Sequence, residues 1–258
     1  MNADLKNPWY EVQGGLYNID DPYFFKEEDF EWTQTLRDNW RVILDEMQQL
    51  VQAEPQRLKP YFSTSLVFPP KNWKTMGFYF WRWRLHGNCN RCPRTTEILD
   101  SIPNLTGGSL SILEPGSNIN PHQGDTNAQV KVHIGLSIPE GLPNCGFQVG
   151  DDIRSWGEGE LLLFCDAHRH TAWNHSKQRR LVFIIDVIRP EFASKTAAIC
   201  ANVLASSILQ ILYQKLKWLN RLPGSVHHSL HFILRSLLRI TLPIQNRVGR
   251  LFHSKGQR

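Results

Sequence analysis

Short apolar or alternating runs fill the middle of the chain, and turn-forming residues separate them. The runs occur near residues 73–85, 110–113, 130–138, 146–149, 161–164 and 181–187. Runs of this length are typical of β-strands, and the connections between them have no helical pattern. The sequence therefore predicts antiparallel sheets in a mainly β fold. A double-stranded β-helix, which is a jelly roll of the cupin-like kind, fits this spacing best.

The segment before this region has helical rather than strand periodicity. From residue 30 to residue 52, apolar side chains recur at intervals of three and four with charges between them, which predicts an amphipathic helix packed on the β core. A second, short helix is expected at Thr95–Ile102. Residues 1–25 are rich in aromatic and turn-forming residues, so we expect them to form an irregular wrap.

The pattern changes again near the end of the chain. An apolar stretch at 197–218 contains scattered polar residues and is expected to be too short and too polar for a membrane span. In the following segment, 226–242, His231, Arg235 and Arg239 stand at successive fourth positions, which predicts a basic amphipathic helix. The apolar side of this helix is expected to consist of Leu230, Ile233, Leu234, Leu237 and Ile240.

The distribution of charge supports a separate tail. The net charge is +5, but ten lysines and arginines and no acidic residue follow Glu191, so the chain up to that point has 19 basic against 24 acidic side chains. We therefore divide the chain into one domain at 1–194, with its β core at about 70–192, and a basic amphipathic helical tail at 195–258.

Two arrangements remain open for this tail. It could form a helical hairpin packed on the β core, or it could lie on an anionic membrane surface, as basic amphipathic helices do. Nucleic acid is not an expected partner, because the tail has few aromatic side chains for base stacking, such as Trp218 and Phe232, and they are not interleaved with its basic residues.

The five cysteines argue against a disulfide-rich secreted domain, because they are few and odd in number. Residues 1–9 also lack the apolar core of a signal peptide. We therefore expect a cytoplasmic protein, with peripheral attachment at the membrane if the tail binds there. Cys89 and Cys92 form a CxxC pair, but no second pair stands at a suitable spacing for zinc, which favours a tight turn before a helix.

Histidines stand at two places where predicted strands begin or end. His122 precedes an alternating strand, and His170 follows an apolar one, with Arg180 a short distance further on. Two imidazoles and a guanidinium could hold a divalent iron ion and an anionic co-substrate. The residues alone leave alternatives open, because His168 could ligate in place of His170 and Asp125 could be a third ligand if its loop bends differently.

Several motifs in this region occur in an order and spacing that resemble one family. They are His122-Gln123-Gly124-Asp125-Thr126-Asn127, Lys131-Val132-His133-Ile134-Gly135-Leu136, Trp156-Gly157-Glu158-Gly159, Phe164-Cys165-Asp166 with His170 and Trp173, and Arg180 with Ile185-Asp186-Val187 and Pro190. Together they resemble the aspartyl/asparaginyl β-hydroxylases, a family of iron(II)- and 2-oxoglutarate-dependent oxygenases. The resemblance covers roughly residues 70–192.

The resemblance implies a metal site made by two histidines, with His122 and His170 as the ligands of iron(II). Non-haem iron oxygenases usually hold the metal with two histidines and a carboxylate. The carboxylate position, two residues after His122, is Gly124 here, which is a peculiarity of the family itself. The motif places the second ligand four residues after Asp166, which selects His170 over His168.

The resemblance also implies how the co-substrate 2-oxoglutarate is bound. Arg180 would hold its distal carboxylate, with the hydroxyl of Ser111 beside it. His133 would contact the carboxylate nearest the metal. Lys131 lies on the same face of the strand and stands where the family usually has arginine. Cys165 stands where the family commonly has aspartate.

These residues together predict an iron(II)- and 2-oxoglutarate-dependent dioxygenase that hydroxylates a C–H bond. The family implies a lipid acyl chain or an aspartyl or asparaginyl residue of a protein as the substrate, and the basic tail favours a lipid-linked one. The alternative is a catalytically inactive binding or scaffold protein with the same fold, which the missing carboxylate at Gly124 and the replacement at Cys165 would permit.

Overall fold

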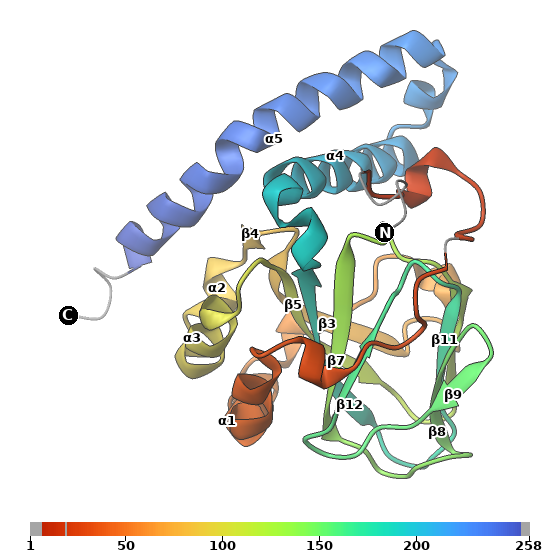
Figure 1. The fold of residues 1–258 in the computed structure, drawn as a ribbon, viewed down its shortest axis with the longest axis vertical. Helices are drawn as coiled ribbons and strands as arrows, with labels where there is room; N and C mark the ends of the chain where they lie inside the picture. Colours follow the sequence, from red (N-terminus) through yellow and green to blue (C-terminus); the bar gives the residue numbers. More distant parts are fainter. Residues whose placement is uncertain (1–6, 19, 254–258) are drawn as a thin grey trace.

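The computed structural model describes residues 7–18 and 20–253, which form two antiparallel sheets with helices beside them (Figure 1). The larger sheet consists of β1 (Lys59–Pro60), β3 (Trp73–Phe80), β4 (Trp83–Arg84), β5 (Leu105–Leu113), β7 (Gln129–Ser137), β10 (Leu161–Phe164) and β12 (Arg180–Ile188). The smaller sheet consists of β2 (Val67–Phe68), β6 (Ser117–His122), β8 (Cys145–Val149), β9 (Asp152–Arg154) and β11 (His170–Asn174).

The order of the strands confirms the predicted double-stranded β-helix. The larger sheet has the order β1-β3-β5-β12-β7-β10, with β4 paired to β3, and the smaller has the order β2-β6-β11-β8-β9. From β5 to β8 successive strands alternate between the two sheets, and they do so again from β10 to β12. A buried apolar cluster joins the two inner faces, with members such as Leu113 and Val182 from one sheet and Ile119 and Phe147 from the other.

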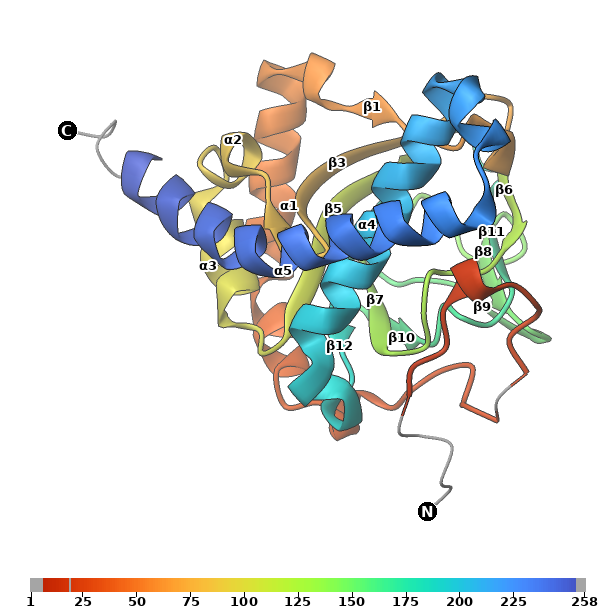
Figure 2. The ribbon, with the colours of Figure 1, turned by 90° about the horizontal axis from the view of Figure 1, so that it is seen from above.

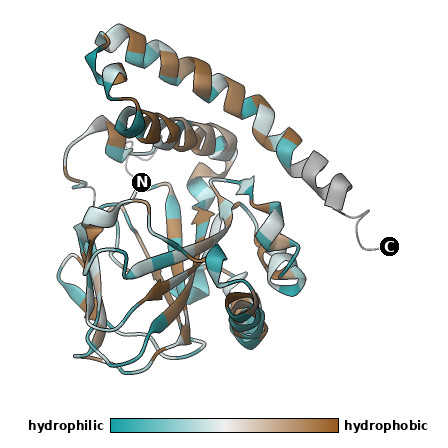
Figure 3. Ribbon diagram, turned by 180° about the vertical axis from the view of Figure 1, so that it is seen from behind, coloured by the Kyte–Doolittle hydropathy of each residue, from teal (hydrophilic) through white to brown (hydrophobic). Residues whose placement is uncertain are grey.

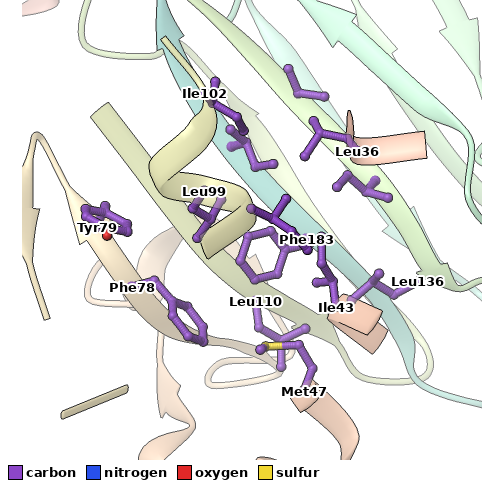
Figure 4. Packing of buried hydrophobic residues seen from close by; sticks show 14 of the residues in the cluster. Leu36, Ile43, Met47, Phe78, Tyr79, Leu99, Ile102, Leu110, Leu136 and Phe183 are labelled. Atoms are coloured by element: carbon purple, nitrogen blue, oxygen red, sulfur yellow. The ribbon is translucent and has the colours of Figure 1, made fainter. Parts of the chain in front are cut away.

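Helices cover the outer face of the larger sheet, as the periodicity of residues 30–52 predicts. Helix α1 (Thr33–Ala53) buries Leu36, Ile43 and Met47 completely, because these residues share one face at helical spacing. Figure 4 shows them packed with side chains of the sheet, among them Leu110 and Phe183. The remaining helices of this side are α2 (His86–Cys89) and α3 (Pro93–Ser101), and short turns of 3-10 helix lie at Glu11–Gln13, Glu27–Asp29, Pro55–Arg57 and Thr64–Leu66.

The single strand expected at residues 73–85 is wrong, because the chain reverses direction within it. Trp81 and Arg82 both have positive φ, at 48° and 67°, and they connect β3 to β4 as a two-residue hairpin turn. Turns of this kind favour glycine or asparagine at both positions. Neither residue is present, so the sequence has no signal for the turn.

The tail is helical, and it packs on one end of the larger sheet. Helix α4 (Thr196–Lys215) follows a 3-10 segment at Pro190–Lys195 and buries Ile199 and Leu204 against Ala128 and Ile188. A short 3-10 segment, η7 (Lys217–Arg221), connects it to α5 (Gly224–His253). Helix α5 then crosses over α4 and packs against it, as seen from above in Figure 2. Packing on the core is therefore observed for α4, and the proposed membrane contact of the tail stays a prediction.

The apolar stretch of the tail, expected to be too short and too polar for a membrane span, is part of a longer continuous helical segment. By length and composition alone, the helical segment Pro190–Lys215 could cross a bilayer, and half of its apolar window is buried inside the protein. Ser206 and Ser207 donate hydrogen bonds to carbonyl groups one turn earlier, at 3.1 and 3.0 Å, so these polar residues continue the helix rather than end it.

Candidate active site

His122 and His170 lie opposite each other on adjacent strands of the smaller sheet. They are register partners where β6 ends and β11 begins, and the centroids of their rings are 4.2 Å apart. The Nδ1 atom of each ring lies 2.9 Å from a backbone carbonyl oxygen, that of Asn120 for His122 and that of His168 for His170. A carbonyl oxygen only accepts hydrogen bonds, so Nδ1 is the protonated nitrogen and Nε2 keeps its lone pair.

Burial favours the metal-binding form of both imidazoles. Loss of solvent lowers the pKa of His122 below its ordinary value of 6.5, and it lowers the pKa of His170 further, with a contribution from the neighbouring His122. Both rings are therefore neutral at pH 7. The structure thus brings the two predicted ligands together in the protonation state that a metal ion requires.

A carboxylate stands beside the position where the sequence lacks one. The amide of Gly124 donates a 2.7 Å hydrogen bond to the carbonyl oxygen of Asp166, and a β-carbon on Gly124 would lie 2.1 Å from Asp166 Oδ2. Asp166 is 2% exposed, and its Oδ1 accepts no hydrogen bond from the described residues. In the sequence, Asp166 stands out only as a marker of the motif. Its place beside Gly124 depends on the tertiary fold.

Lys131 pairs with carboxylates in this structure. Its ammonium group forms an ion pair with Asp186 and lies 3.4 Å from Asp166 Oδ2. Burial opposes the charge on Lys131, but the two carboxylates outweigh burial and raise its pKa. The predicted contact of Lys131 with the co-substrate stays a prediction. In this structure its ammonium group lies between the carboxylates of Asp186 and Asp166.

Arg180 is a buried cation without a complete set of partners. It is 1% exposed at the start of β12, and its Nε and Nη1 atoms make no hydrogen bond to the described residues. Its guanidinium lies 4.2 Å from the centroid of the Trp156 ring. Burial lowers the pKa of Arg180 to about 10, yet the group remains charged at pH 7. A buried charge of this kind is costly unless an anion compensates it.

Ser111 and His133 also have hydrogen-bonding capacity left. Ser111 Oγ accepts a 2.9 Å hydrogen bond from Trp73 Nε1, which leaves its own hydroxyl proton to donate. His133 Nδ1 and Trp156 Nε1 are buried and have no partner among the described residues. The ring centroids of His133 and Trp156 are 6.0 Å apart, so these groups and Arg180 form one polar cluster.

Aromatic side chains connect this polar cluster to the histidine pair. Phe147 and Phe164 each contact the ring of His133, at 5.1 and 4.9 Å between centroids, and each also contacts His170, at 6.0 and 5.7 Å. The two imidazoles and the unpaired guanidinium are thus parts of one interior site between the sheets. Trp156 and Phe164 appear in the sequence only as parts of the family motifs, and Phe147 has no signal there, because an apolar strand residue does not indicate a functional site.

The alternative metal ligands do not join the histidine pair. His168 Nε2 lies 2.9 Å from the carbonyl oxygen of Asp21, and its ring packs against Tyr17 and Tyr23. Within residues 7–18 and 20–253, no three histidine, cysteine, aspartate or glutamate residues are grouped so that they could hold a metal ion. Neither Asp125 nor the buried Cys89 and Cys92 belongs to such a group among the described residues.

Comparisons with known proteins identify the family of this chain. The sequence profile of the family described as aspartyl/asparaginyl beta-hydroxylase matches residues 37–190. The ornithine lipid ester-linked acyl 2-hydroxylase of Rhizobium tropici is 28% identical over 70% of this chain and 66% of its own length. The human aspartyl/asparaginyl beta-hydroxylase is 28% identical over 71% of this chain and 26% of its own. The mouse aspartate beta-hydroxylase domain-containing protein 2 is 31% identical over 67% of this chain and 52% of its own.

This chain therefore matches only part of the length of these relatives. Among solved structures, a cupin domain of a transcriptional regulator from Enterobacter cloacae covers 46% of this chain with 11% identity and a TM-score of 0.32. The family profile spans more than half of the chain, and it includes both histidines, Arg180 and the strands that position them. The chain belongs to the aspartyl/asparaginyl β-hydroxylase family.

Proposed function

We propose that this protein is an iron(II)- and 2-oxoglutarate-dependent hydroxylase whose metal is held by His122 and His170. The observation that carries the proposal is the buried guanidinium of Arg180, whose Nε and Nη1 lack hydrogen-bond partners among the described residues. A dicarboxylate with one end at Arg180 and the other at the histidine pair would supply the missing counter-charge. Ser111 and His133 have the remaining donors that such a ligand would need.

The chemistry requires a bound group, and the chain supplies its environment. Iron(II) with 2-oxoglutarate activates oxygen, so that one oxygen atom enters a C–H bond while the co-substrate becomes succinate and carbon dioxide. His122 and His170 are oriented for metal binding by their Nδ1 hydrogen bonds. Phe147 and Phe164 line the route between them and the polar cluster, where they exclude water. Asp166 lies beside Gly124, and the ammonium group of Lys131 lies 3.4 Å from its carboxylate.

We propose a lipid acyl chain as the first candidate substrate and an aspartyl or asparaginyl residue of a protein as the second. Relatives named for each of these substrates match this chain at the same identity, 28%, so similarity does not decide between them. The basic tail supports the lipid, because ten lysines and arginines and no acidic residue follow Glu191. Mass spectrometry of lipids and peptides from cells with and without the protein, searching for the gain of one oxygen, would identify the substrate.

Succinate release by the purified protein tests the reaction itself. With iron(II), 2-oxoglutarate and oxygen, we expect succinate to form, and we expect His122→Ala to abolish both succinate release and iron uptake. If the protein does not bind 2-oxoglutarate and His122→Ala leaves iron uptake unchanged, the proposal is wrong. Binding of iron and 2-oxoglutarate with no product in lipids or peptides would instead favour the inactive scaffold.

The cysteines support the proposed cytoplasmic location. All five are free and buried, although Cys89 and Cys92 are close in sequence. Burial raises the pKa of the Cys92 thiol to about 12, which keeps it protonated and unreactive. Cysteines in this state are compatible with a reducing compartment, where no disulfide is needed for stability.

A further inference from the structure

Helix α5 has two apolar faces, and the described part of the protein covers only one of them. Leu238 and Leu242 are 6% exposed and pack in one cluster with residues of α4. On the outward side, Ile233, Leu237, Ile240 and Ile244 are each exposed by 52% or more. Their spacing of four, three and four places them along one side of the helix. We call these four residues the outer stripe.

This division differs from the sequence prediction, which placed Ile233, Leu234, Leu237 and Ile240 on one apolar side. Leu234 packs toward α4, and Leu238 and Leu242 complete the inward face. The helix also continues through Pro243 to His253, beyond the predicted end at residue 242. Figure 3 shows hydrophobic positions along most of α5, which is more than a helix packed on one side requires.

The charge around the outer stripe identifies the kind of surface that would cover it. After Glu191 the chain contains ten lysines and arginines and no aspartate or glutamate. Of these, Arg239 is exposed, and the guanidinium of Arg235 lies 5.6 Å from the centroid of the exposed Phe232 ring. An apolar stripe on a segment whose charged residues are all positive complements an anionic interface. A second copy of the same stripe would bring like charges together.

The connection between α4 and α5 also places exposed apolar side chains next to basic residues. Trp218 is 59% exposed in η7, and Leu216 is 42% exposed just before it. Lys215, Lys217 and Arg221 are their neighbours in sequence. Tryptophan next to lysine and arginine is typical of segments at the boundary between lipid headgroups and acyl chains.

We propose that the outer stripe binds the surface of a bilayer that contains anionic phospholipid. Ile233, Leu237, Ile240 and Ile244 enter the boundary between headgroups and acyl chains, and the basic residues of the tail contact the phosphates. This interaction is separate from the proposed hydroxylase activity. It does not require metal or 2-oxoglutarate.

The position of α4 gives this binding a consequence for the active site. Helix α4 packs on Ala128 and Ile188, and Ile188 is the register partner of Gln129 at the start of β7. Gln129 in turn donates a 3.3 Å hydrogen bond to Asp166, the carboxylate beside Gly124. The tail helices therefore lie beyond the end of the larger sheet where β7 begins and β12 ends (Figure 1). A bilayer bound by α5 would be held at that end of the molecule.

Vesicle flotation with the full chain tests the proposal. Vesicles of phosphatidylcholine with phosphatidylglycerol are compared with vesicles of phosphatidylcholine alone, at low and high salt. We expect binding to the anionic vesicles only, with weaker binding at high salt because screening weakens the basic contacts. The affinity of the triple variant Ile233→Gln, Leu237→Gln, Ile240→Gln for anionic vesicles should fall about tenfold or more. Each substitution removes apolar area that would enter the bilayer.

A matched variant separates the outer stripe from general surface apolarity. Leu142 and Ile153 are 48% and 50% exposed on connections and edges of the β structure, and Leu142→Gln, Ile153→Gln should leave flotation unchanged. Circular dichroism and size-exclusion chromatography of all variants check folding and oligomeric state. Equal flotation of the triple variant, or no flotation of the wild type on anionic vesicles, overturns the proposal. A dimer that the triple variant converts to a monomer would show that a second copy covers the stripe instead.

Discussion

The carboxylate of Asp166 fills the space into which a side chain at position 124 would project. A β-carbon on Gly124 would lie 2.1 Å from Oδ2 and 2.4 Å from Cγ of Asp166. The carbonyl oxygen of Asp166 also accepts the Gly124 amide at 2.7 Å, which fixes the two segments together. The absence of a side chain at one residue and the carboxylate at the other are thus two parts of one arrangement.

We therefore expect Gly124→Asp to impair the site rather than to restore the usual three-ligand arrangement. The new side chain must displace Asp166, at a cost of about 1–3 kcal/mol typical of overpacking. The melting temperature and the affinity for iron(II) should both be lower than in the wild type. In the double variant Gly124→Asp, Asp166→Gly the space is free again, and stability should recover relative to Gly124→Asp alone. If Gly124→Asp alone were as stable as the wild type, Asp166 would not occupy the space that a side chain at position 124 needs.

The second prediction separates the two candidate histidines near β11. Replacing His122 or His170 by alanine removes a proposed ligand, so iron affinity should fall by more than about 100-fold, since even the partners that orient ligands contribute about 10–100-fold. His168→Ala is the matched control, because His168 bonds to the Asp21 carbonyl and packs between tyrosines. Isothermal titration with iron(II) under anaerobic conditions measures all three. A loss of iron binding in His168→Ala comparable to that in His170→Ala would assign the ligand to residue 168.

The third prediction concerns the cost of the unpaired charge at Arg180. Methionine at this position removes a buried cation that the described residues compensate only in part, so Arg180→Met should be as stable as the wild type or more stable without ligand. The wild type should gain stability when 2-oxoglutarate is added, because a ligand that binds only the folded state raises the melting temperature. The variant should lose this gain. A preserved shift in melting temperature would mean that the co-substrate binds elsewhere.

Sequence reasoning succeeds here where periodicity or local motif spacing determines the structure. The helix at 33–53 and the alternation of strands follow from apolar spacing, and the approach of His122 to His170 follows from the placement of each at a strand end. The sequence does not predict features that depend on tertiary contacts. The turn at Trp81 and Arg82 has no glycine to mark it, and the place of Asp166 beside Gly124 appears only when distant segments meet.

The two faces of α5 are a further limit of the sequence. A periodic pattern identifies apolar positions, but it does not tell which of them a neighbouring helix will cover. Leu234 was grouped with Ile233 and Leu237 because all three are apolar and close in helical projection. The packing of α4 against Leu238 and Leu242 determines which apolar residues of α5 are buried. That packing depends on where β12 ends, because α4 follows β12 in the chain.

The N-terminal wrap is attached to the end of the β core by a buried ion pair between residues 168 positions apart. Arg189 donates hydrogen bonds of 2.7 and 3.1 Å to the two carboxylate oxygens of Asp21, and the Tyr17 hydroxyl donates to the same carboxylate. The side chains of Asp21 and Arg189 are 8% and 9% exposed. Breaking a pair of this kind by removing one partner is expensive, because the other charge is left buried.

The final prediction is that Asp21→Asn lowers the free energy of unfolding by about 2–4 kcal/mol at pH 7. This is somewhat below the usual cost for a buried pair, because Arg189 keeps a 2.7 Å contact with Glu191. Burial raises the pKa of Asp21, but the hydrogen bonds from Arg189 and Tyr17 outweigh burial and lower the pKa below its ordinary 3.8. The stabilisation is therefore present above pH 3.8 and disappears as the pH falls through the lowered pKa.

Urea unfolding of the wild type and Asp21→Asn at pH 7, and at successively lower pH below 4, measures this difference. It should shrink as Asp21 becomes protonated in the folded wild type. Asp152→Asn is the control, because Asp152 pairs with Arg154 at 2.8 Å while both side chains are well exposed, at 38% and 43%. Its effect should stay below about 1 kcal/mol, as for surface pairs in general. An equal effect of the two substitutions at pH 7 would mean that the Asp21 pair does not hold the N-terminal wrap in place.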